Sequence, residues 1–230
     1  MRFSRVWRVA GFLLALGVSG ASAQTATYTL GVGNTSTGGM SGYPAPYATV
    51  TVNLTSSTTA SLTFAAATAG NYQYLFLDSS IVDANVNAAS WTAGSFAGST
   101  LNSNFSPFTC ANTGCNGGSA TVDGFGVFNQ TVNSFDGYNY AQSTVSFILT
   151  DTSGTWANAA SVLTPNSNGY LAAAHMAVCD TSLGACSPSI AAIATGYATT
   201  SAVPEPTSFM LAAAGLGGLG FLRRRRRKSA

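Results

Sequence analysis

Four cysteines form two local pairs in the sequence, Cys110 with Cys115 and Cys179 with Cys186. Such thiols either join as disulfides in an oxidising compartment or, as four thiolates, bind one zinc ion. Four cysteines allow three disulfide connectivities, and the sequence does not choose among them. Because the spacings are looser than is usual in zinc sites, we expect disulfides, each adding about 2 to 3 kcal/mol by closing a short loop.

His175 is the only histidine of the chain. A Ser-His-Asp triad is formally available because serine and aspartate are plentiful, but no G-x-S-x-G elbow accompanies them. No Lys or Arg in the middle of the chain is available to hold a transition-state anion. We therefore expect a structural role for His175 on an alanine-rich strand, no catalytic residue and no enzymatic activity.

Two Asp-Gly pairs, Asp123-Gly124 and Asp136-Gly137, lie among asparagines in turn-like contexts. Oxygen-rich loops of this kind bind calcium in extracellular proteins. Turn chemistry explains the same residues without a metal, and their spacing matches no calcium-binding loop. We therefore predict no metal site and no cofactor.

Six aromatic residues are candidates for stacking on sugar rings: Trp91, Trp156, Tyr43, Tyr47, Tyr138 and Tyr140. Such stacking needs flat, exposed rings, whereas rings of this kind more often fill the core of a β-sheet protein. Carbohydrate binding is therefore an alternative function, with exopolysaccharide as the partner.

The cysteine, histidine, aspartate and aromatic residues described above must be held in place by the secondary structure. Hydrophobic and polar residues alternate along much of the chain, and this pattern predicts short strands. The pattern is clear in residues 49–54, 62–64, 72–76 and 144–149. Residues 170–179 fit a further strand, although their alanines would also allow a helix. Many short strands separated by Gly, Asn, Asp and Ser turns predict an all-β fold, an antiparallel β-sandwich.

Charged residues make up only 7% of the 230 residues, and they are segregated. All nine basic residues lie in segments 2–8 and 223–228, while the middle contains six aspartates and no base, a charge of −6. Because nucleic-acid binding depends on Lys and Arg against phosphates, the middle of the chain excludes nucleic acid as a partner. The hydrophilic surface of this part of the chain must therefore be provided by Ser, Thr, Asn and Gln side chains.

The first 23 residues predict a secretory signal peptide. Arg2, Arg5 and Arg8 precede an apolar run over residues 9–18, and small residues follow at 21–23. At 1.5 Å per residue, the run reaches only about half of the 30 Å hydrocarbon core. Signal peptidase is therefore an expected partner, cleaving between Ala23 and Gln24.

The C-terminus combines Pro204-Glu205-Pro206, an apolar stretch over residues 207–222 and a basic cluster. The prolines can neither continue a helix nor donate to a sheet, so this part should be extended and accessible. The apolar stretch predicts a single transmembrane helix about 24 Å long, whose basic end stays in the cytoplasm. This cluster consists of Arg223, Arg224, Arg225, Arg226, Arg227 and Lys228.

This order of parts resembles the sorting region of PEP-CTERM proteins, which Gram-negative bacteria export. The resemblance rests on Pro204-Glu205-Pro206, the short Gly/Ala-rich apolar segment and the terminal arginines, and it covers about the last 28 residues. It implies that the Pro-Glu-Pro residues are recognised by a membrane-embedded exosortase, which cleaves near them. It further implies delivery to the cell surface or to a biofilm matrix of exopolysaccharide. The alternative is a C-terminal anchor that is never cut.

The sequence thus predicts a signal peptide at 1–23, an exported β-sandwich domain at 24–202 and a sorting tail at 203–230. Contact with the membrane is transient and runs through the tail helix. The expected function is that of a non-enzymatic surface or matrix protein, and the alternative is a carbohydrate-binding module of the same architecture.

Overall fold

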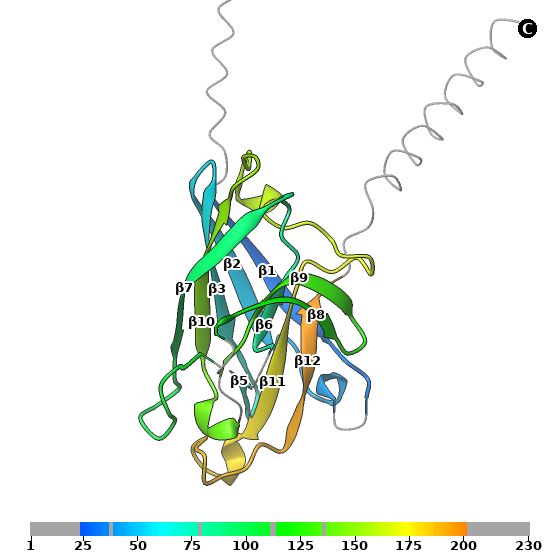
Figure 1. Ribbon diagram of the computed structural model, residues 1–230. Coiled ribbons are helices and arrows are strands. Elements are labelled where there is room, and N and C mark those ends of the chain that lie inside the picture. The colour runs from blue at the N-terminus through cyan, green and yellow to red at the C-terminus, as the bar shows by residue number, and fades with distance from the viewer. Residues whose placement is uncertain (1–23, 37–38, 78–79, 111–113, 135–136, 202–230) are drawn as a thin grey trace, which may run out of the picture.

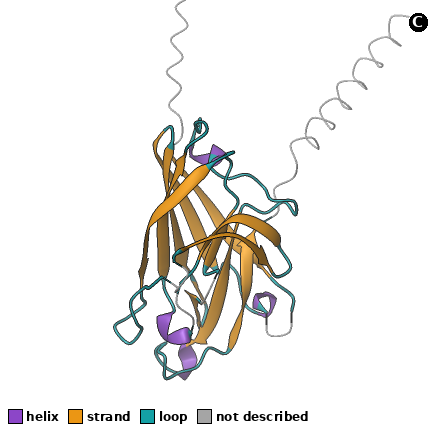
Figure 2. Cartoon of the chain, in the orientation of Figure 1, coloured by secondary structure: helices purple, strands orange, loops and turns teal. Residues whose placement is uncertain are grey.

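The computed structural model describes residues 24–36, 39–77, 80–110, 114–134 and 137–201. The predicted signal peptide and sorting tail lie outside the described residues. Strands dominate the described part (Figures 1 and 2). They are β1 Thr25–Gly33, β2 Ala48–Ser56, β3 Thr59–Ala66, β4 Thr68–Ala69, β5 Tyr72–Phe76, β6 Val82–Ala84, β7 Trp91–Ser99, β8 Asn116–Val122, β9 Gly126–Val132, β10 Thr144–Asp151, β11 Ala172–Asp180 and β12 Ala194–Thr200.

Helix is limited, among these residues, to 3-10 turns of three residues each, such as Met40–Gly42 and Ala159–Ser161. None of the helices in the described part has the length and apolar character needed to cross a membrane. The segment that was compatible with strand or helix, residues 170–179, lies mostly in strand β11, which runs from Ala172 to Asp180. The prediction of an all-β, antiparallel fold is confirmed.

The strands do not form the two separate sheets of a sandwich. They belong to one hydrogen-bonded sheet in the order β7-β10-β3-β2-β1-β12-β11-β6-β9-β8, with β5 also on β11 and β4 on β5. This sheet curls until it nearly closes on itself (Figure 1). Register shifts in the pairings of β1, β7 and β8 mark irregularities of the kind that increase local twist and bending.

Two links bring distant parts of the sheet together. Phe76 at the end of β5 forms a bridge to Gln142, just before β10, with backbone hydrogen bonds of 2.8 and 2.9 Å. Trp91 on β7 donates its indole N–H to Gln130 Oε1 on β9 at 3.0 Å. Strands at opposite ends of the path are therefore tied to each other, and the curled sheet encloses the core.

The main core lies inside the curled sheet, and alternate residues of each strand contribute to it. Val50 and Val52 of β2, Phe64 of β3 and Phe147 of β10 point inward and are at most 1% exposed. The Phe64 and Phe147 rings stack with centroids 6.3 Å apart. This alternation is the one the sequence shows, because inward and outward positions repeat with period two on a strand.

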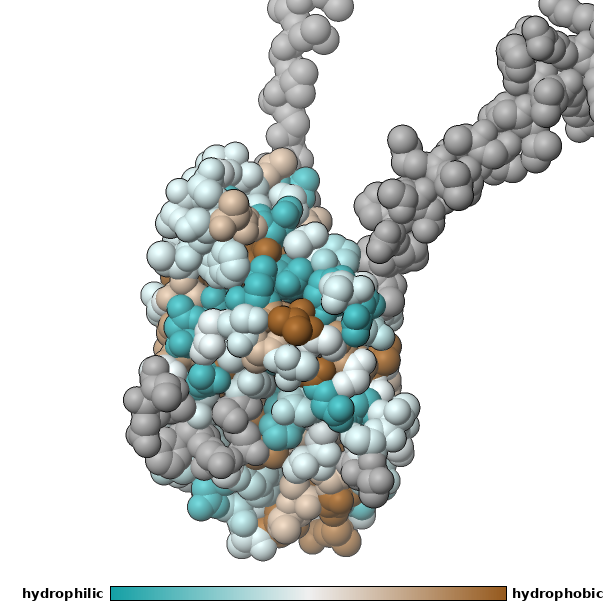
Figure 3. Space-filling view, turned by 45° about the vertical axis from the view of Figure 1, so that its right-hand side comes forward, coloured by the Kyte–Doolittle hydropathy of each residue, from teal (hydrophilic) through white to brown (hydrophobic). Residues whose placement is uncertain are grey.

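A second layer covers the outer side of β11. Ala173 packs with Phe125 and Phe128 from the β8–β9 hairpin, and Ala177 packs with Leu75 and Phe105. Strand β11 is therefore buried on both faces, which explains its run of small residues. On the face that Figure 3 shows, the surface is mostly polar, with small separate apolar areas.

Candidate functional site

The two ends of the described chain lie on neighbouring strands in the middle of the sheet. Strand β12 pairs with β1 on one side and with β11 on the other. Strand β1 begins at Thr25, directly after Gln24, and β12 ends at Thr200. In the sequence, Pro204 follows Thr200 by four residues. The folded part of the chain, residues 24–201, which we call the body, is therefore joined to both of its terminal segments through central strands.

Side-chain hydrogen bonds fix the end of β12. Thr199 Oγ1 donates to the carbonyl oxygen of Ala172 at 2.7 Å, and Thr200 Oγ1 accepts the backbone N–H of Leu171 at 3.1 Å. Both threonines are buried. The last described residue, Ser201, is exposed. The body therefore ends in an ordered, buried strand, and the chain reaches the surface within one residue.

Asn34 attaches β12 to the loop that follows β1. Its Oδ1 accepts the backbone N–H of Tyr197 at 3.0 Å and that of Met40 at 3.2 Å. A Cβ on Gly196 would lie 2.6 Å from this oxygen, so only glycine fits there. The amide nitrogen of Asn34 donates to Asp123 Oδ2 at 3.1 Å, which adds the β8–β9 turn to the same cluster.

The structure pairs all four described cysteines locally. Cys110 is bonded to Cys115 with Cα atoms 4.6 Å apart, and Cys179 to Cys186 with Cα atoms 5.9 Å apart. Because no described cysteine is free, the four-thiolate zinc alternative is wrong. No group of three or more His, Cys, Asp or Glu side chains among the described residues is placed to hold a metal.

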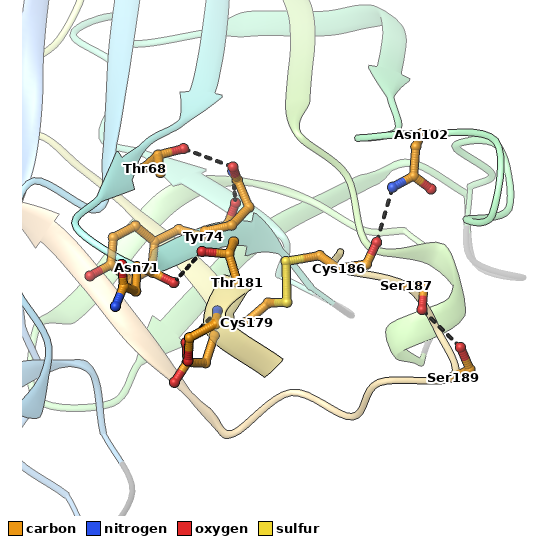
Figure 4. The surroundings of a disulfide bond; sticks show 12 residues. Thr68, Asn71, Tyr74, Asn102, Cys179, Thr181, Cys186, Ser187 and Ser189 are labelled. Atoms are coloured by element: carbon orange, nitrogen blue, oxygen red, sulfur yellow. Dashed lines mark hydrogen bonds between the residues drawn. A yellow bond between two sulfur atoms is a disulfide. The ribbon is translucent and has the colours of Figure 1, made fainter. Parts of the chain in front are cut away.

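The second disulfide closes a loop between the end of β11 and the β11–β12 connection, and hydrogen bonds attach this loop to neighbouring segments (Figure 4). Asn102 donates its amide N–H to the carbonyl oxygen of Cys186 at 3.0 Å. Thr181 donates its backbone N–H and its hydroxyl to the carbonyl oxygen of Asn71 at 2.7 and 2.8 Å. Cys179 and Cys186 are buried, whereas Cys110 is exposed.

Removing the disulfides should therefore have unequal effects. Replacing Cys179 and Cys186 together by serine should lower the free energy of unfolding by about 3 kcal/mol or more, because loop closure is lost and hydroxyls replace buried sulfur atoms. The same change at Cys110 and Cys115 should cost less, about 2 kcal/mol, because Cys110 is exposed. Urea unfolding of both double variants measures the difference, and equal losses would contradict the assignment.

His175 lies on the outer face of β11 and stacks on Tyr197 of β12, its partner in register. The ring centroids are 4.6 Å apart and the planes are 22° from parallel. The imidazole is half-buried between the two outer clusters that contain Ala173 and Ala177. This position accounts for His175 as a packing residue of the outer layer.

The six aromatic candidates do not form one exposed platform. Trp156 and Tyr47 are each 3% exposed, and the Trp156 indole N–H donates to the carbonyl oxygen of Asn87 at 2.8 Å. Tyr43 packs edge-on against Tyr72, with centroids 5.3 Å apart. The remaining rings, Trp91, Tyr138 and Tyr140, are half-buried. These residues mainly serve packing and hydrogen bonding inside the body.

The first Asp-Gly pair forms a turn. Asp123 and Gly124 connect β8 to β9, and Gly124 has φ +79°, a conformation that favours glycine. The hydrogen bond from Asn34 occupies one Asp123 carboxylate oxygen. Turn chemistry therefore explains this pair, whereas Asp136 lies outside the described residues.

One acidic residue that sequence reasoning did not single out is fully buried. Asp83 on β6 is 0% exposed, and its Oδ1 accepts the hydroxyl proton of Thr131 on β9. Its Oδ2 has no hydrogen-bond partner among the described residues. Burial raises the pKa of this carboxyl to about 8. The signal in the sequence is an aspartate directly flanked by hydrophobic residues, in Ile81-Val82-Asp83-Ala84.

The fold and its C-terminal attachment define a disulfide-bonded all-β domain that is followed at once by a tail. Residues 202–227 of that tail match the family model described as the PEP-CTERM protein-sorting motif, so the chain is a PEP-CTERM sorting domain-containing protein. The motif implies an exported, membrane-anchored precursor of a Gram-negative bacterium and its processing by an exosortase. No curated protein and no solved structure matches the chain.

The match includes Pro204, Glu205 and Pro206 and most of the basic cluster, from Arg223 to Arg227. These residues, Lys228 and Ala23 lie outside the described part of the chain, while Gln24 is its first residue. Their assigned roles in sorting, stop-transfer and signal cleavage stay predictions.

Proposed function

We propose that this chain is a non-enzymatic protein of the cell surface or extracellular matrix, separated from its membrane anchor by an exosortase. The observation that carries the proposal is the place of the motif. The twelve strands of the described residues all precede it, and the last of them, β12, ends in buried residues at Thr200, four residues before Pro204. A cut near Pro204-Glu205-Pro206 would therefore release the body without removing any part of its fold.

Three features support a role without catalysis. The only histidine is stacked on Tyr197, and Asp83, the fully buried carboxyl among the described residues, lies between strands of the sheet. No Lys or Arg occurs between Val9 and Leu222 to stabilise a developing negative charge. The alternative, carbohydrate binding, is favoured not by the six aromatic residues but by the uncharged outer face of β1, β2, β3 and β10.

Replacing Pro204, Glu205 and Pro206 by alanine should abolish release of the body. The chain would then keep its apolar tail and stay in the membrane as a precursor, because the recognition residues are lost. Intact-mass analysis of protein from the membrane fraction and from the medium measures both termini and the disulfides. Ser201→Ala, which changes an exposed residue just before the motif, is the control and should be released normally. Normal release of the triple variant would overturn the proposal.

A further inference from the structure

The outer face of four neighbouring strands presents rows of hydroxyl groups. In the central row, Thr27 of β1 lies opposite Thr51 of β2, Thr51 opposite Thr63 of β3, and Thr63 opposite Ser146 of β10. These strands lie side by side in the sheet (Figure 1). Neighbouring strands are about 4.8 Å apart, so the register places the four hydroxyl-bearing residues at regular intervals.

Two flanking rows continue the pattern at the positions two residues before and after the central row. One contains Thr29, Thr49, Ala65 and Thr144, and the other Thr25, Asn53, Ser61 and Ile148. Successive residues on one face of a strand are about 6.8 Å apart. We call these three rows the hydroxyl face. All of its residues are exposed or half-buried, while the residues between them on each strand point into the core.

The hydroxyl face carries no charge. None of its three rows contains an aspartate, and the whole stretch between Val9 and Leu222 lacks Lys and Arg. An acidic polymer would find no cation on this face, and a basic segment would find no carboxylate. An apolar partner would find only two apolar side chains, Ala65 and Ile148, in separate rows. The partner that such a face complements is itself uncharged and rich in hydroxyl groups.

Most of these hydroxyls are not used inside the body. Thr27 and Thr51 lie at the limit of a mutual hydrogen bond, with Oγ1 atoms 3.4 Å apart. Within the described residues, Thr49, Thr63 and Ser146 make no side-chain hydrogen bond. Threonine is branched at Cβ and restricted at χ1, so a threonine on a strand loses little freedom when it binds. The face therefore offers donors and acceptors in fixed positions.

From this arrangement we infer that the hydroxyl face binds an uncharged polysaccharide, laid across β1, β2, β3 and β10. Sugar hydroxyls donate and accept hydrogen bonds, as threonine and serine hydroxyls do. Threonine methyl groups between them provide small apolar contacts for the C–H faces of sugar rings. The inference rests on the proposed function only in that the body must reach the outside of the cell to meet such a polymer.

Retention of the full-length chain on amorphous cellulose, a neutral polysaccharide, tests the inference. We expect retention that is unchanged between 50 mM and 1 M NaCl, since no ionic contact is involved. Alginate, an acidic polysaccharide, should not retain the protein. The triple variant Thr51→Val, Thr63→Val and Ser146→Ala should bind cellulose at least about tenfold more weakly, because each of the three lost hydrogen bonds contributes roughly 0.5–1.5 kcal/mol.

Valine keeps the shape and strand preference of threonine, so the triple variant should fold, and its thermal unfolding should match that of the wild type. Thr121→Val is the matched control, because Thr121 is exposed on β8, at the other end of the sheet path. Absence of retention, retention that salt abolishes, or equal binding by the triple variant would each overturn the inference. Processing of the tail is measured separately, so failure here leaves the proposed release untouched.

Discussion

Asp83→Asn is expected to stabilise the body by about 4 kcal/mol at pH 7 and to flatten its dependence on pH. The carboxyl is fully buried and its pKa is raised to about 8, against 3.8 for an ordinary aspartate, because burial disfavours the charged form. Between these values the unfolded chain releases a proton that the folded chain keeps. The contribution of Asp83 to folding stability is therefore most favourable below about pH 4, and it falls by about 1.4 kcal/mol per pH unit between about pH 4 and pH 8.

Asparagine preserves the shape of the side chain and an oxygen for the Thr131 hydroxyl, but it does not ionise. Urea unfolding of wild type and variant at pH 4, 5.5, 7 and 8 measures the effect, and the difference should grow with pH. Asp180→Asn is the control. The Asp180 carboxylate accepts hydrogen bonds from Ser182, which lower its pKa, so this variant should retain the wild-type loss between pH 4 and 8. If the free energies of unfolding of wild type and Asp83→Asn changed with pH in parallel, Asp83 would not be buried in its protonated form.

The sequence predicts the central strands well and the outer ones poorly. Alternation of large hydrophobic residues with Thr and Ser marks β2, β3 and β10, because each has one face in the core and one in solvent. Strands β7 and β8 consist mainly of Gly, Ala, Ser and Thr and lie at the two ends of the sheet path, so their pattern is weak.

The number of sheets could not be predicted from the same pattern. A two-sheet sandwich and a single curled sheet bury alternate residues in the same way, and the difference lies in long-range pairing. The link between Phe76 and Gln142 joins residues that are far apart in the sequence, and no local signal marks it. The hydroxyl face could not be predicted for the same reason, because the register of β2 and β3 is what places Thr51 opposite Thr63.

The sorting tail, in contrast to the number of sheets, could be predicted from the sequence alone. The Pro-Glu-Pro residues, the apolar stretch and the basic cluster follow one another directly, so their meaning is local and the sequence alone reveals it. The sequence around Asp83 also gives a local signal, but the burial of Asp83 depends on the pairing of β6 with β9 and β11. What the structure adds to the tail is its attachment to a buried central strand.

A chain that ends after Ile193 should fail to fold, whereas one that ends after Ser201 should be as stable as the processed protein. The shorter chain lacks β12, which pairs with both β1 and β11 and carries the buried residues Ala198, Thr199 and Thr200. Its loss would leave two central strands with open edges, which promote aggregation. Circular dichroism, urea unfolding and gel filtration of the two chains measure the contrast.

A finer variant tests the same strand without truncation. Gly196→Ala should lower the free energy of unfolding by about 1–3 kcal/mol, because its Cβ would lie 2.6 Å from Asn34 Oδ1. The control is Thr195→Ala, an exposed neighbour on β12, which should change stability by less than about 0.5 kcal/mol. A cooperative, wild-type unfolding transition in the chain ending after Ile193 would show that β12 is dispensable. If β12 is required, an exosortase can leave the body intact only by cutting beyond Thr200, which is where the sorting motif lies.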